Sequence, residues 1–197
     1  MNLPNKLTIF RIILVPIMVI IPFLNIPGEL VNIPIQNLIM LAIFAIASYT
    51  DHLDGKIARK NNMVTTFGKF ADPLADKILV LSAMLLLMEL DYRLPAWIPI
   101  IVLTREFAVS GYRLIAVEKG GTVIAASIWG KIKTCTQMIA IILAFIDTNA
   151  FAAFIDNNLF GYELVINVLS SSLMVISTIA AVFSGADYLK GSKELLK

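Results

Sequence analysis

The chain has 197 residues, about the length of one domain, but its composition is unlike that of a water-soluble domain. Hydrophobic residues make up 58% and charged residues 15%, against roughly 45–50% and about 25% in soluble domains. These values exclude an intrinsically disordered chain and indicate a membrane protein. The net charge of +2 is too small to indicate nucleic-acid binding, and a single cysteine excludes an internal disulfide.

Six apolar stretches follow one another along the chain. A bilayer core about 30 Å thick needs about 20 helical residues to cross it. The predicted spans are, in chain order, 7–24, 38–50 with an extension toward Lys60, 74–90, 96–117, 128–146 and 165–183. They leave little chain for anything else. We therefore expect residues 1–197 to form one all-α membrane domain with six transmembrane helices.

The basic residues indicate how these helices are oriented. If both termini are cytoplasmic, every Lys and Arg except Arg93 lies in a cytoplasmic segment or at a cytoplasmic helix end. Basic residues are enriched on the cytoplasmic side of membrane proteins. We therefore expect both termini, and the chemistry of the charged residues, to face the cytoplasm.

Four aspartates interrupt the apolar pattern at two neighbouring helix ends. Asp51 and Asp54 are three residues apart at the end of the second span, and Asp72 and Asp76 are four residues apart at the start of the third. Each pair shares one face of a helix at these spacings. The two helix ends can thus present four carboxylates to one pocket.

Carboxylates near hydrocarbon repel one another and lose hydration unless they have a partner. A divalent cation is the simplest partner, and ligands that are all oxygen favour Mg²⁺ or Mn²⁺ over zinc. Two ions that share bridging carboxylates would fit four aspartates, an arrangement typical of phosphoryl chemistry. The ring of His52 would point about 100° away from Asp51 on a helical wheel, so we do not expect it to be a ligand.

Small residues and one arginine border the aspartates. Gly55, Ala58 and Gly68 each lie one helical turn from an aspartate, and a phosphate or nucleotide could approach the backbone closely there. Tight packing between helices would explain the same residues without a ligand. Arg59 could hold a phosphate bidentately, or it could anchor the cytoplasmic helix end.

Taken together, these residues form the pattern DxxDGxxAR, eight further residues and GxxxDxxxD, which resembles the signature of the CDP-alcohol phosphotransferases. Every position of the signature is met, at Asp51, Asp54, Gly55, Ala58, Arg59, Gly68, Asp72 and Asp76. The resemblance implies an integral membrane enzyme of six helices, commonly a homodimer, that uses two divalent ions. Such enzymes transfer a substituted phosphate from a CDP-linked donor to an alcohol and release CMP.

Four other segments, at 2–11, 72–77, 104–107 and 129–134, resemble bacterial members of the family that use glycerol 3-phosphate. They imply transfer of a phosphatidyl group from CDP-diacylglycerol to sn-glycerol 3-phosphate in the bacterial cytoplasmic membrane, the committed step of phosphatidylglycerol synthesis. A sibling enzyme that uses inositol phosphate, serine or phosphatidylglycerol is the main alternative. An ion-coupled transporter is a remote one, because intramembrane aspartates also mark ion paths, but these four carboxylates cluster at the cytoplasmic helix ends.

The resemblance also implies a role for each residue of the signature. All four aspartates ligate the ions, and Asp76 is in addition the general base that takes the proton from the acceptor hydroxyl. The cytidine and diphosphate of the donor are expected to lie against Gly55, Ala58, Arg59 and Gly68. We expect Asn5, Thr8 and Arg11 to cap or brace this nucleotide site.

An acceptor that carries a phosphate needs cations, and the sequence offers Arg105, Arg113, Lys131 and Lys133. The two arginines are eight residues apart, so both can point into one cavity about two turns apart. Glu106 is expected to pair with Arg113, seven residues further on. Anchoring at the membrane and attraction of anionic lipid headgroups remain the alternative role for these basic residues, above all for the lysines.

Overall fold

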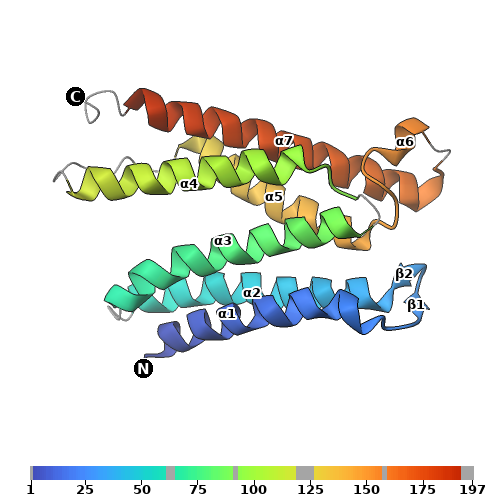
Figure 1. Ribbon diagram of the computed structural model, residues 1–197, viewed down its shortest axis with the longest axis horizontal. Helices are drawn as coiled ribbons and strands as arrows, with labels where there is room; N and C mark the ends of the chain where they lie inside the picture. Colours follow the sequence, from blue (N-terminus) through green and yellow to red (C-terminus); the bar gives the residue numbers. More distant parts are fainter. Residues whose placement is uncertain (1, 61–64, 91–92, 119–126, 157–158, 192–197) are drawn as a thin grey trace. The chain divides into compact units, whose positions relative to one another are not determined.

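Helices make up most of the chain. The computed structural model describes residues 2–60, 65–90, 93–118, 127–156 and 159–191, with the backbone alone at 52–60, 66, 67, 69, 114, 116–118 and 189–191. Its α-helices are α1 (Leu3–Ile20), α2 (Ile35–Lys60), α3 (Thr66–Glu89), α4 (Trp97–Glu118), α5 (Ile128–Ile146), α6 (Ala153–Asp156) and α7 (Gly161–Gly191) (Figure 1). The prediction of an all-α protein is confirmed.

The long helices correspond to the predicted spans, but most of them have different ends. Helix α5 has the predicted bounds, whereas α1 begins at Leu3, α3 begins at Thr66 and α7 extends beyond 165–183 in both directions. Apolar runs mark the part of a helix that avoids water, while backbone hydrogen bonds continue the helix through polar residues. Hydropathy therefore located the helices better than it located their ends.

Three helical segments in the described part of the chain are long and apolar enough to cross a membrane, judged by length and composition. They are Leu3–Leu24, Ile128–Ile146 and Gly161–Tyr188. The first consists of α1 and the short 3-10 helix η1 (Ile21–Leu24). These segments agree with the membrane class that the composition indicates.

The chain divides into two compact units. The first comprises Met1–Arg93 and Ala144–Thr148, and the second comprises Leu94–Leu143 and Asn149–Lys197. The first unit therefore holds α1, α2, α3 and the last residues of α5. The second holds α4, α6, α7 and the greater part of α5.

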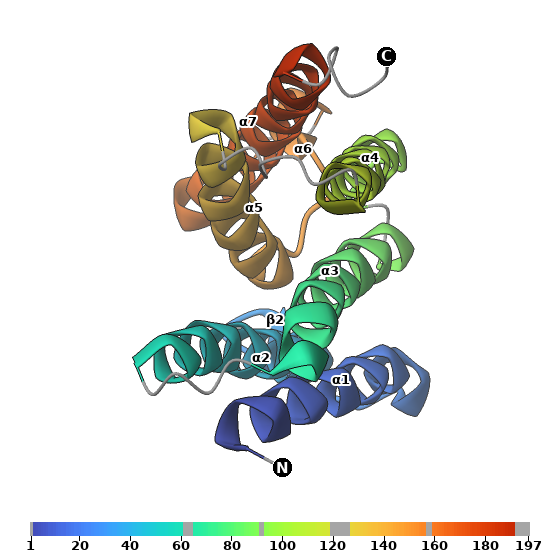
Figure 2. The ribbon, with the colours of Figure 1, turned by 90° about the vertical axis from the view of Figure 1, so that its left-hand side faces the viewer.

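In the first unit, α1 packs against both α2 and α3 (Figure 2). Met18, Phe44 and Leu79 contribute completely buried side chains, one from each of these helices. The ring of Phe44 lies 6.3 Å from that of Phe145, measured between centroids. Large apolar side chains such as Phe10 remain exposed on α1, as expected of a face that meets lipid. Because α1 contacts both neighbours, it can position groups on each of them.

A short hairpin turns the chain from α1 to α2. Strands β1 (Glu29–Leu30) and β2 (Ile33–Pro34) are antiparallel, with Leu30 opposite Ile33. Val31 and Asn32 between them both have positive φ, as a two-residue type I′ turn requires. So short a connection makes α1 and α2 antiparallel neighbours. The first turns of α1 consequently lie beside the part of α2 that carries Asp51.

Helix α3 begins at a threonine cap. The Thr65 hydroxyl oxygen accepts a hydrogen bond from the backbone N–H of Gly68 at 3.0 Å, which satisfies one of the N–H groups left unpaired at a helix start. Asp72 and Asp76 follow within the first three turns. The cap thus determines where the helix that carries them begins.

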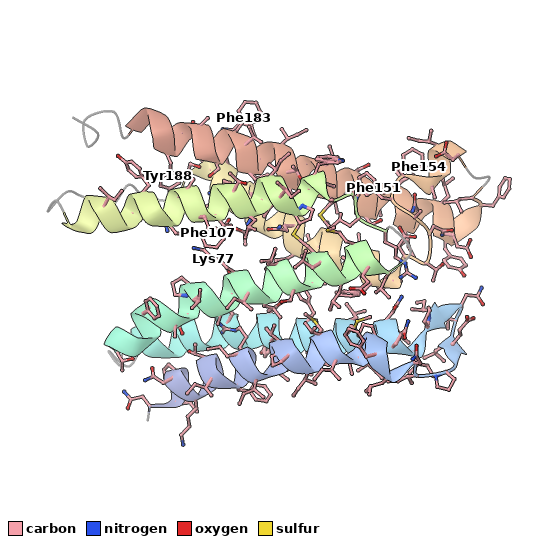
Figure 3. All side chains as sticks on the ribbon, in the orientation of Figure 1. Lys77, Phe107, Phe151, Phe154, Phe183 and Tyr188 are labelled. Carbon is pink, nitrogen blue, oxygen red and sulfur yellow. The ribbon has the colours of Figure 1, made fainter. Side chains whose placement is uncertain are left out.

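In the second unit, α4 packs along α7, and α5 contacts both helices through side chains (Figure 2). Trp129 at the start of α5 stacks on Phe183 of α7, with the ring centroids 5.1 Å apart and the planes at 28°. Phe183 and Tyr188 both project from the second half of α7 (Figure 3). The start of α5 is therefore held next to the part of α7 that carries Tyr188.

Candidate active site

The two helix ends predicted to carry carboxylates are helical, as expected. Asp51 and Asp54 belong to α2, and Asp72 and Asp76 belong to α3. The side chains of Asp51, Asp72 and Asp76 are partly exposed. The side chains at Asp54, Ala58 and Arg59, and the surroundings of Gly55, lie outside the described residues.

Helix α1 contacts one aspartate on each neighbouring helix. Arg11, which is completely buried, forms an ion pair with Asp51, with Nη1 2.9 Å from Oδ1. The Nε of Arg11 also donates to the backbone carbonyl of Ala47 at 3.3 Å. Thr8, likewise completely buried, donates from its hydroxyl to Oδ1 of Asp72. One face of α1 thus holds a carboxylate from α2 and another from α3.

Asn5, one turn before Thr8, contacts the start of α3. Its Oδ1 accepts a hydrogen bond from the Thr65 hydroxyl at 2.8 Å. Gly68 lies between these groups, and a Cβ added there would be 3.4 Å from Asn5 Oδ1 and 3.5 Å from Asp72 Oδ2. A side chain at this position would fill the space beside the Asp72 carboxylate. Gly68 therefore lies beside the Asp72 carboxylate.

The aspartates fit a hard divalent cation by their chemistry, because they offer carboxylate oxygens alone. The Asp72 oxygen that is not bonded to Thr8 faces the space that a side chain at Gly68 would fill. Among the described residues, no three His, Cys, Asp or Glu side chains are grouped so as to hold a metal ion, and the side chain of Asp54 is not among them. Asp51, Asp54, Asp72 and Asp76 are the residues that would hold such ions.

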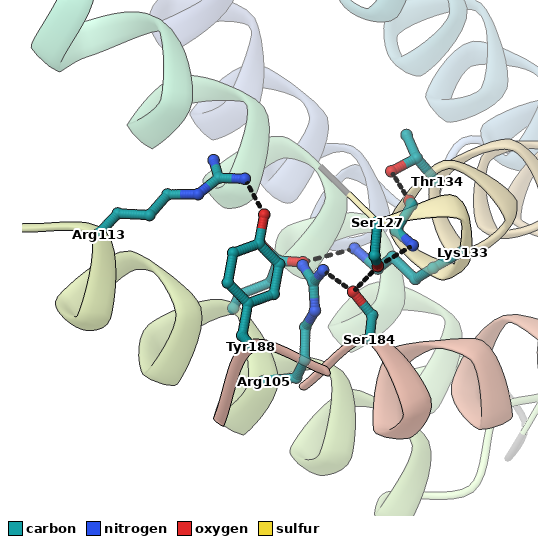
Figure 4. Close-up of polar contacts among 9 residues, drawn as sticks. Arg105, Arg113, Ser127, Lys133, Thr134, Ser184 and Tyr188 are labelled. Carbon is teal, nitrogen blue, oxygen red and sulfur yellow. Dashed lines mark hydrogen bonds and ion pairs between the residues drawn. The ribbon is translucent and has the colours of Figure 1, made fainter. Parts of the chain in front are cut away.

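A second polar group, here called the cation cluster, joins α4, α5 and α7. Its members are Arg105, Glu106, Arg113, Ser127, Lys133, Ser184 and Tyr188 (Figure 4). Glu106 Oε1 accepts from Arg105 Nη1 at 2.7 Å and from Lys133 Nζ at 2.8 Å. Three cations accompany one carboxylate, so the cluster has an excess of two positive charges. That excess suits a doubly charged anion.

The prediction that Glu106 pairs with Arg113 is wrong. Glu106 pairs with Arg105 and Lys133, whereas Arg113 donates to the hydroxyl of Tyr188. The Arg113 guanidinium also lies 5.2 Å from the centre of the Tyr188 ring. The prediction used the spacing of residues within α4 alone. In the structure, the partners come from other helices, Lys133 from α5 and Tyr188 from α7.

Ser184 and Tyr188 are site residues that sequence reasoning missed. They lie one turn apart on α7, and their side chains are almost completely buried. Arg105 donates to the Ser184 hydroxyl, and its guanidinium lies 6.0 Å from the centre of the Tyr188 ring. The Ser184 oxygen is also 3.3 Å from that of Ser127. The sequence feature that could have indicated them is the spacing of two polar side chains, four residues apart, in an apolar helix.

Two glycines leave room for Arg105. A Cβ at Gly130 would lie 3.4 Å from both Arg105 Nη2 and Ser184 Oγ, and a Cβ at Gly185 would lie 3.4 Å from Arg105 Cγ. These distances lie at the close limit of ordinary van der Waals contact, so a side chain larger than a methyl group would press on Arg105. Small residues on α5 and α7 thus allow the guanidinium to lie between the helices.

Three of the four predicted acceptor cations come together in the cation cluster. Arg105 and Lys133 have side chains only 12% and 8% exposed, while Arg113 is more exposed. Lys131 is exposed and lies two residues before Lys133 on α5. Residues two apart on a helix do not share a face, so Lys131 points away from the direction of Lys133.

Residues 1–183 match the CDP-alcohol phosphatidyltransferase family. The chain belongs to this family. Among its relatives is the CDP-diacylglycerol–glycerol-3-phosphate 3-phosphatidyltransferase of Bacillus subtilis, 42% identical over the whole chain and 97% of that protein. Proteins with the same name from Haemophilus influenzae and Rickettsia typhi are 36% and 32% identical, each over 98% of this chain and over 94% and 97% of their own lengths. The family resemblance of the aspartate pattern is confirmed.

Replacing Glu106 with glutamine should lower the thermal stability of the detergent-solubilised protein. The change leaves Arg105 and Lys133 without the carboxylate that they share, and a hydrogen bond to a charged group contributes about 1.5–3 kcal/mol. We expect a clear decrease in Tm by thermal unfolding. Lys131→Gln is the matched control, because that side chain is exposed. Equal Tm values for wild type and Glu106→Gln would show that the shared carboxylate does not stabilise the cluster.

Proposed function

We propose that this chain transfers a phosphatidyl group from CDP-diacylglycerol to sn-glycerol 3-phosphate, giving phosphatidylglycerophosphate and CMP. The observation that carries the choice of acceptor is the cation cluster, whose excess of two positive charges matches a phosphate monoester dianion. The names of full-length relatives from several bacteria support the same donor and acceptor. The reaction is the committed step of phosphatidylglycerol synthesis.

Other acceptors used by sibling enzymes fit this cluster less well. Serine carries no phosphate, and phosphatidylglycerol carries a phosphodiester with a single negative charge. Inositol phosphate does carry a phosphate monoester, so the cluster would accept its charge too. The names of the relatives favour glycerol 3-phosphate over inositol phosphate. An ion-coupled transporter is not favoured, because the chain belongs to a family of transferases.

The proposal includes the setting of the enzyme in the bacterial cytoplasmic membrane. We expect six transmembrane helices, both termini in the cytoplasm and an active site that faces the cytoplasm. Nearly all basic residues would then lie on that side, as the positive-inside rule favours. The family match runs through both compact units, which supports one functional domain over 1–197. A homodimer is the expected assembly.

The donor would be held by the first unit. Two divalent ions, Mg²⁺ or Mn²⁺, would be held by Asp51, Asp54, Asp72 and Asp76, and when bound they stabilise negative charge on the diphosphate and on the departing CMP. The residues proposed to line the cytidine and diphosphate are Gly55, Ala58, Arg59 and Gly68, with Asn5 and Thr8 supporting this site. The small residues among them let the nucleotide approach the backbone.

Asp76 is the proposed general base. It would take the proton from the 1-hydroxyl of glycerol 3-phosphate as that oxygen attacks the β-phosphorus of the donor. A new P–O bond forms while the bond from this phosphorus to the CMP oxygen breaks, and CMP leaves with the electron pair. Asp76 lies one turn beyond Asp72 on α3, so the base and a metal ligand share one helix face.

The acceptor phosphate would be bound by Arg105, Arg113 and Lys133, with Lys131 nearby on α5. This phosphate does not react, so its contacts contribute binding and positioning in the ground state and the transition state alike. Arginine suits this task, because its planar guanidinium can donate two parallel hydrogen bonds to a phosphate.

Purified protein should release CMP from CDP-diacylglycerol when glycerol 3-phosphate and Mg²⁺ or Mn²⁺ are present. We expect much slower release of CMP with serine, inositol phosphate, phosphatidylglycerol or plain glycerol. None of these acceptors combines a primary hydroxyl, such as the 1-hydroxyl of glycerol 3-phosphate, with a small phosphate monoester. A chelator should stop the reaction, and excess Mg²⁺ or Mn²⁺ should restore it. Faster release with another acceptor of the panel would assign the chain to a sibling activity.

Substituting Asp76 with asparagine should lower kcat far more than it weakens donor binding. Loss of a general base acts on the transition state and typically costs about 10²- to 10⁴-fold, while the other aspartates continue to hold the ions. Steady-state kinetics with varied CDP-diacylglycerol would measure both effects. A normal kcat together with a collapse of donor affinity would make Asp76 a metal ligand and nothing more.

Arg113→Ala should raise the KM for glycerol 3-phosphate and leave the KM for CDP-diacylglycerol nearly unchanged. Losing one charge-assisted hydrogen bond costs about 1.5–3 kcal/mol, roughly 10- to 150-fold in affinity. Arg113→Lys should recover part of the loss, since it restores the charge without the bidentate geometry. Tyr188→Phe, which keeps the ring but removes the hydroxyl bonded to Arg113, should show a smaller rise. An equal effect on glycerol 3-phosphate and plain glycerol would place Arg113 outside the acceptor site.

A further inference from the structure

Helix α1 carries three polar side chains at intervals of three residues, and each contacts the carboxylate site. Asn5 bonds to the start of α3, Thr8 bonds to Asp72 and Arg11 pairs with Asp51. Intervals of three keep side chains on one side of a helix. We propose that this stripe, Asn5, Thr8 and Arg11, positions Asp51 and Asp72 for divalent cations and so sets the metal affinity of the site. The inference rests on the proposed function in taking these two aspartates as metal ligands.

Burial separates this role from contact with a nucleotide. The side chains of Thr8 and Arg11 are 0% exposed, so neither offers a surface to a substrate. Their polar atoms are instead directed at groups on α2 and α3. An effect of these residues on the nucleotide would therefore pass through the carboxylates.

Thr8 determines which oxygen of Asp72 is available to a cation. Its hydroxyl has one proton to donate, and the Asp72 Oδ1 is nearer to it than the carbonyl of Pro4, which is at 3.1 Å. With Oδ1 held in this way, the carboxylate cannot turn freely. Its Oδ2 then faces the space beside Gly68. Removal of a group that orients a metal ligand in this way typically lowers metal affinity by about 10- to 100-fold.

Arg11 holds Asp51 for an electrostatic reason. A completely buried guanidinium without a counter-charge is very unfavourable, so the fold favours arrangements in which Asp51 stays next to α1. The pair uses Oδ1 of Asp51, whose side chain is 42% exposed. The positive charge also offsets part of the repulsion among neighbouring carboxylates. The pair thus lowers the electrostatic cost of bringing Asp51 near the other aspartates when a cation binds.

Asn5 extends the same control to the position of α3 itself. It accepts from the Thr65 hydroxyl, and the oxygen of that hydroxyl caps α3 through the N–H of Gly68. Asp72 lies one turn beyond Gly68. A shift of this helix start would move the carboxylate, and metal sites tolerate misplacement of only about 0.5 Å.

The test is Mn²⁺ binding to the full-length protein in nanodiscs without substrate, measured from the electron paramagnetic resonance signal of free Mn²⁺. Thr8→Val removes the hydroxyl and keeps the shape of the side chain, and should weaken Mn²⁺ binding by about 10- to 100-fold. Thr8→Ser should bind close to the wild type. The matched control is Thr104→Val on α4, whose hydroxyl bonds to the backbone of its own helix at 2.8 Å, and its Mn²⁺ affinity should not change.

A second measurement separates positioning from catalysis. If Thr8 acts through Asp72, saturating Mn²⁺ should restore most of the kcat of Thr8→Val. Should Thr8→Val fold poorly, Thr8→Ala removes the same hydroxyl with less bulk and carries the same expectation. Asp72→Asn should weaken Mn²⁺ binding at least as much as Thr8→Val.

Unchanged Mn²⁺ affinity in Thr8→Val would overturn the proposal. So would weaker binding of CDP-diacylglycerol together with normal Mn²⁺ affinity, because that result would make Thr8 a nucleotide contact. These outcomes are independent of the acceptor panel. The proposed function fails if the wild type releases no CMP with glycerol 3-phosphate, whatever the Mn²⁺ affinities of the variants.

Discussion

Charge buried among apolar helices has to be paired, and the polar architecture of this protein depends on that requirement. Arg11 is completely buried and is paired with Asp51 on another helix. Arg105 and Lys133 are mostly buried and share Glu106, which links α4 to α5. In lipid, apolar contact provides little driving force for helix association, because the lipid tails are as apolar as the side chains. These pairs therefore both neutralise charge and hold particular helix faces together.

Neutral hydroxyl groups complete both sites. Thr8 bonds to a carboxylate, while Ser184 and Tyr188 bond to the two arginines of α4. A hydroxyl orients a charged side chain without changing the net charge of its surroundings. The aspartate site can thus remain negative enough to attract cations, and the cation cluster positive enough to bind a phosphate. In the proposed function, these uncharged residues would thus influence what each site can bind.

The same arrangement explains why helices near the two ends of the chain matter to the chemistry. Helix α1 carries none of the four aspartates, yet it contacts Asp51 and Asp72. Helix α7 carries none of the predicted acceptor cations, yet it receives hydrogen bonds from Arg105 and Arg113. In each unit, a helix that carries none of the proposed ligands contacts the residues proposed to bind metal or phosphate. Such support is what pre-organised sites require.

The sequence by itself determined the membrane class, the positions of the long helices and the aspartate pattern that identifies the family. Those features are local, because the length of an apolar run, a polar interruption and an i,i+3 or i,i+4 spacing each depend on one helix. Tertiary structure alone decided the partners. The spacing along α4 predicted a pair between Glu106 and Arg113. In the structure, Glu106 instead pairs with the Lys133 ammonium of α5, and Arg113 donates to the Tyr188 hydroxyl of α7. Periodicity states which residues share a face, but which face of another helix lies opposite is set by how side chains fill the space between helices.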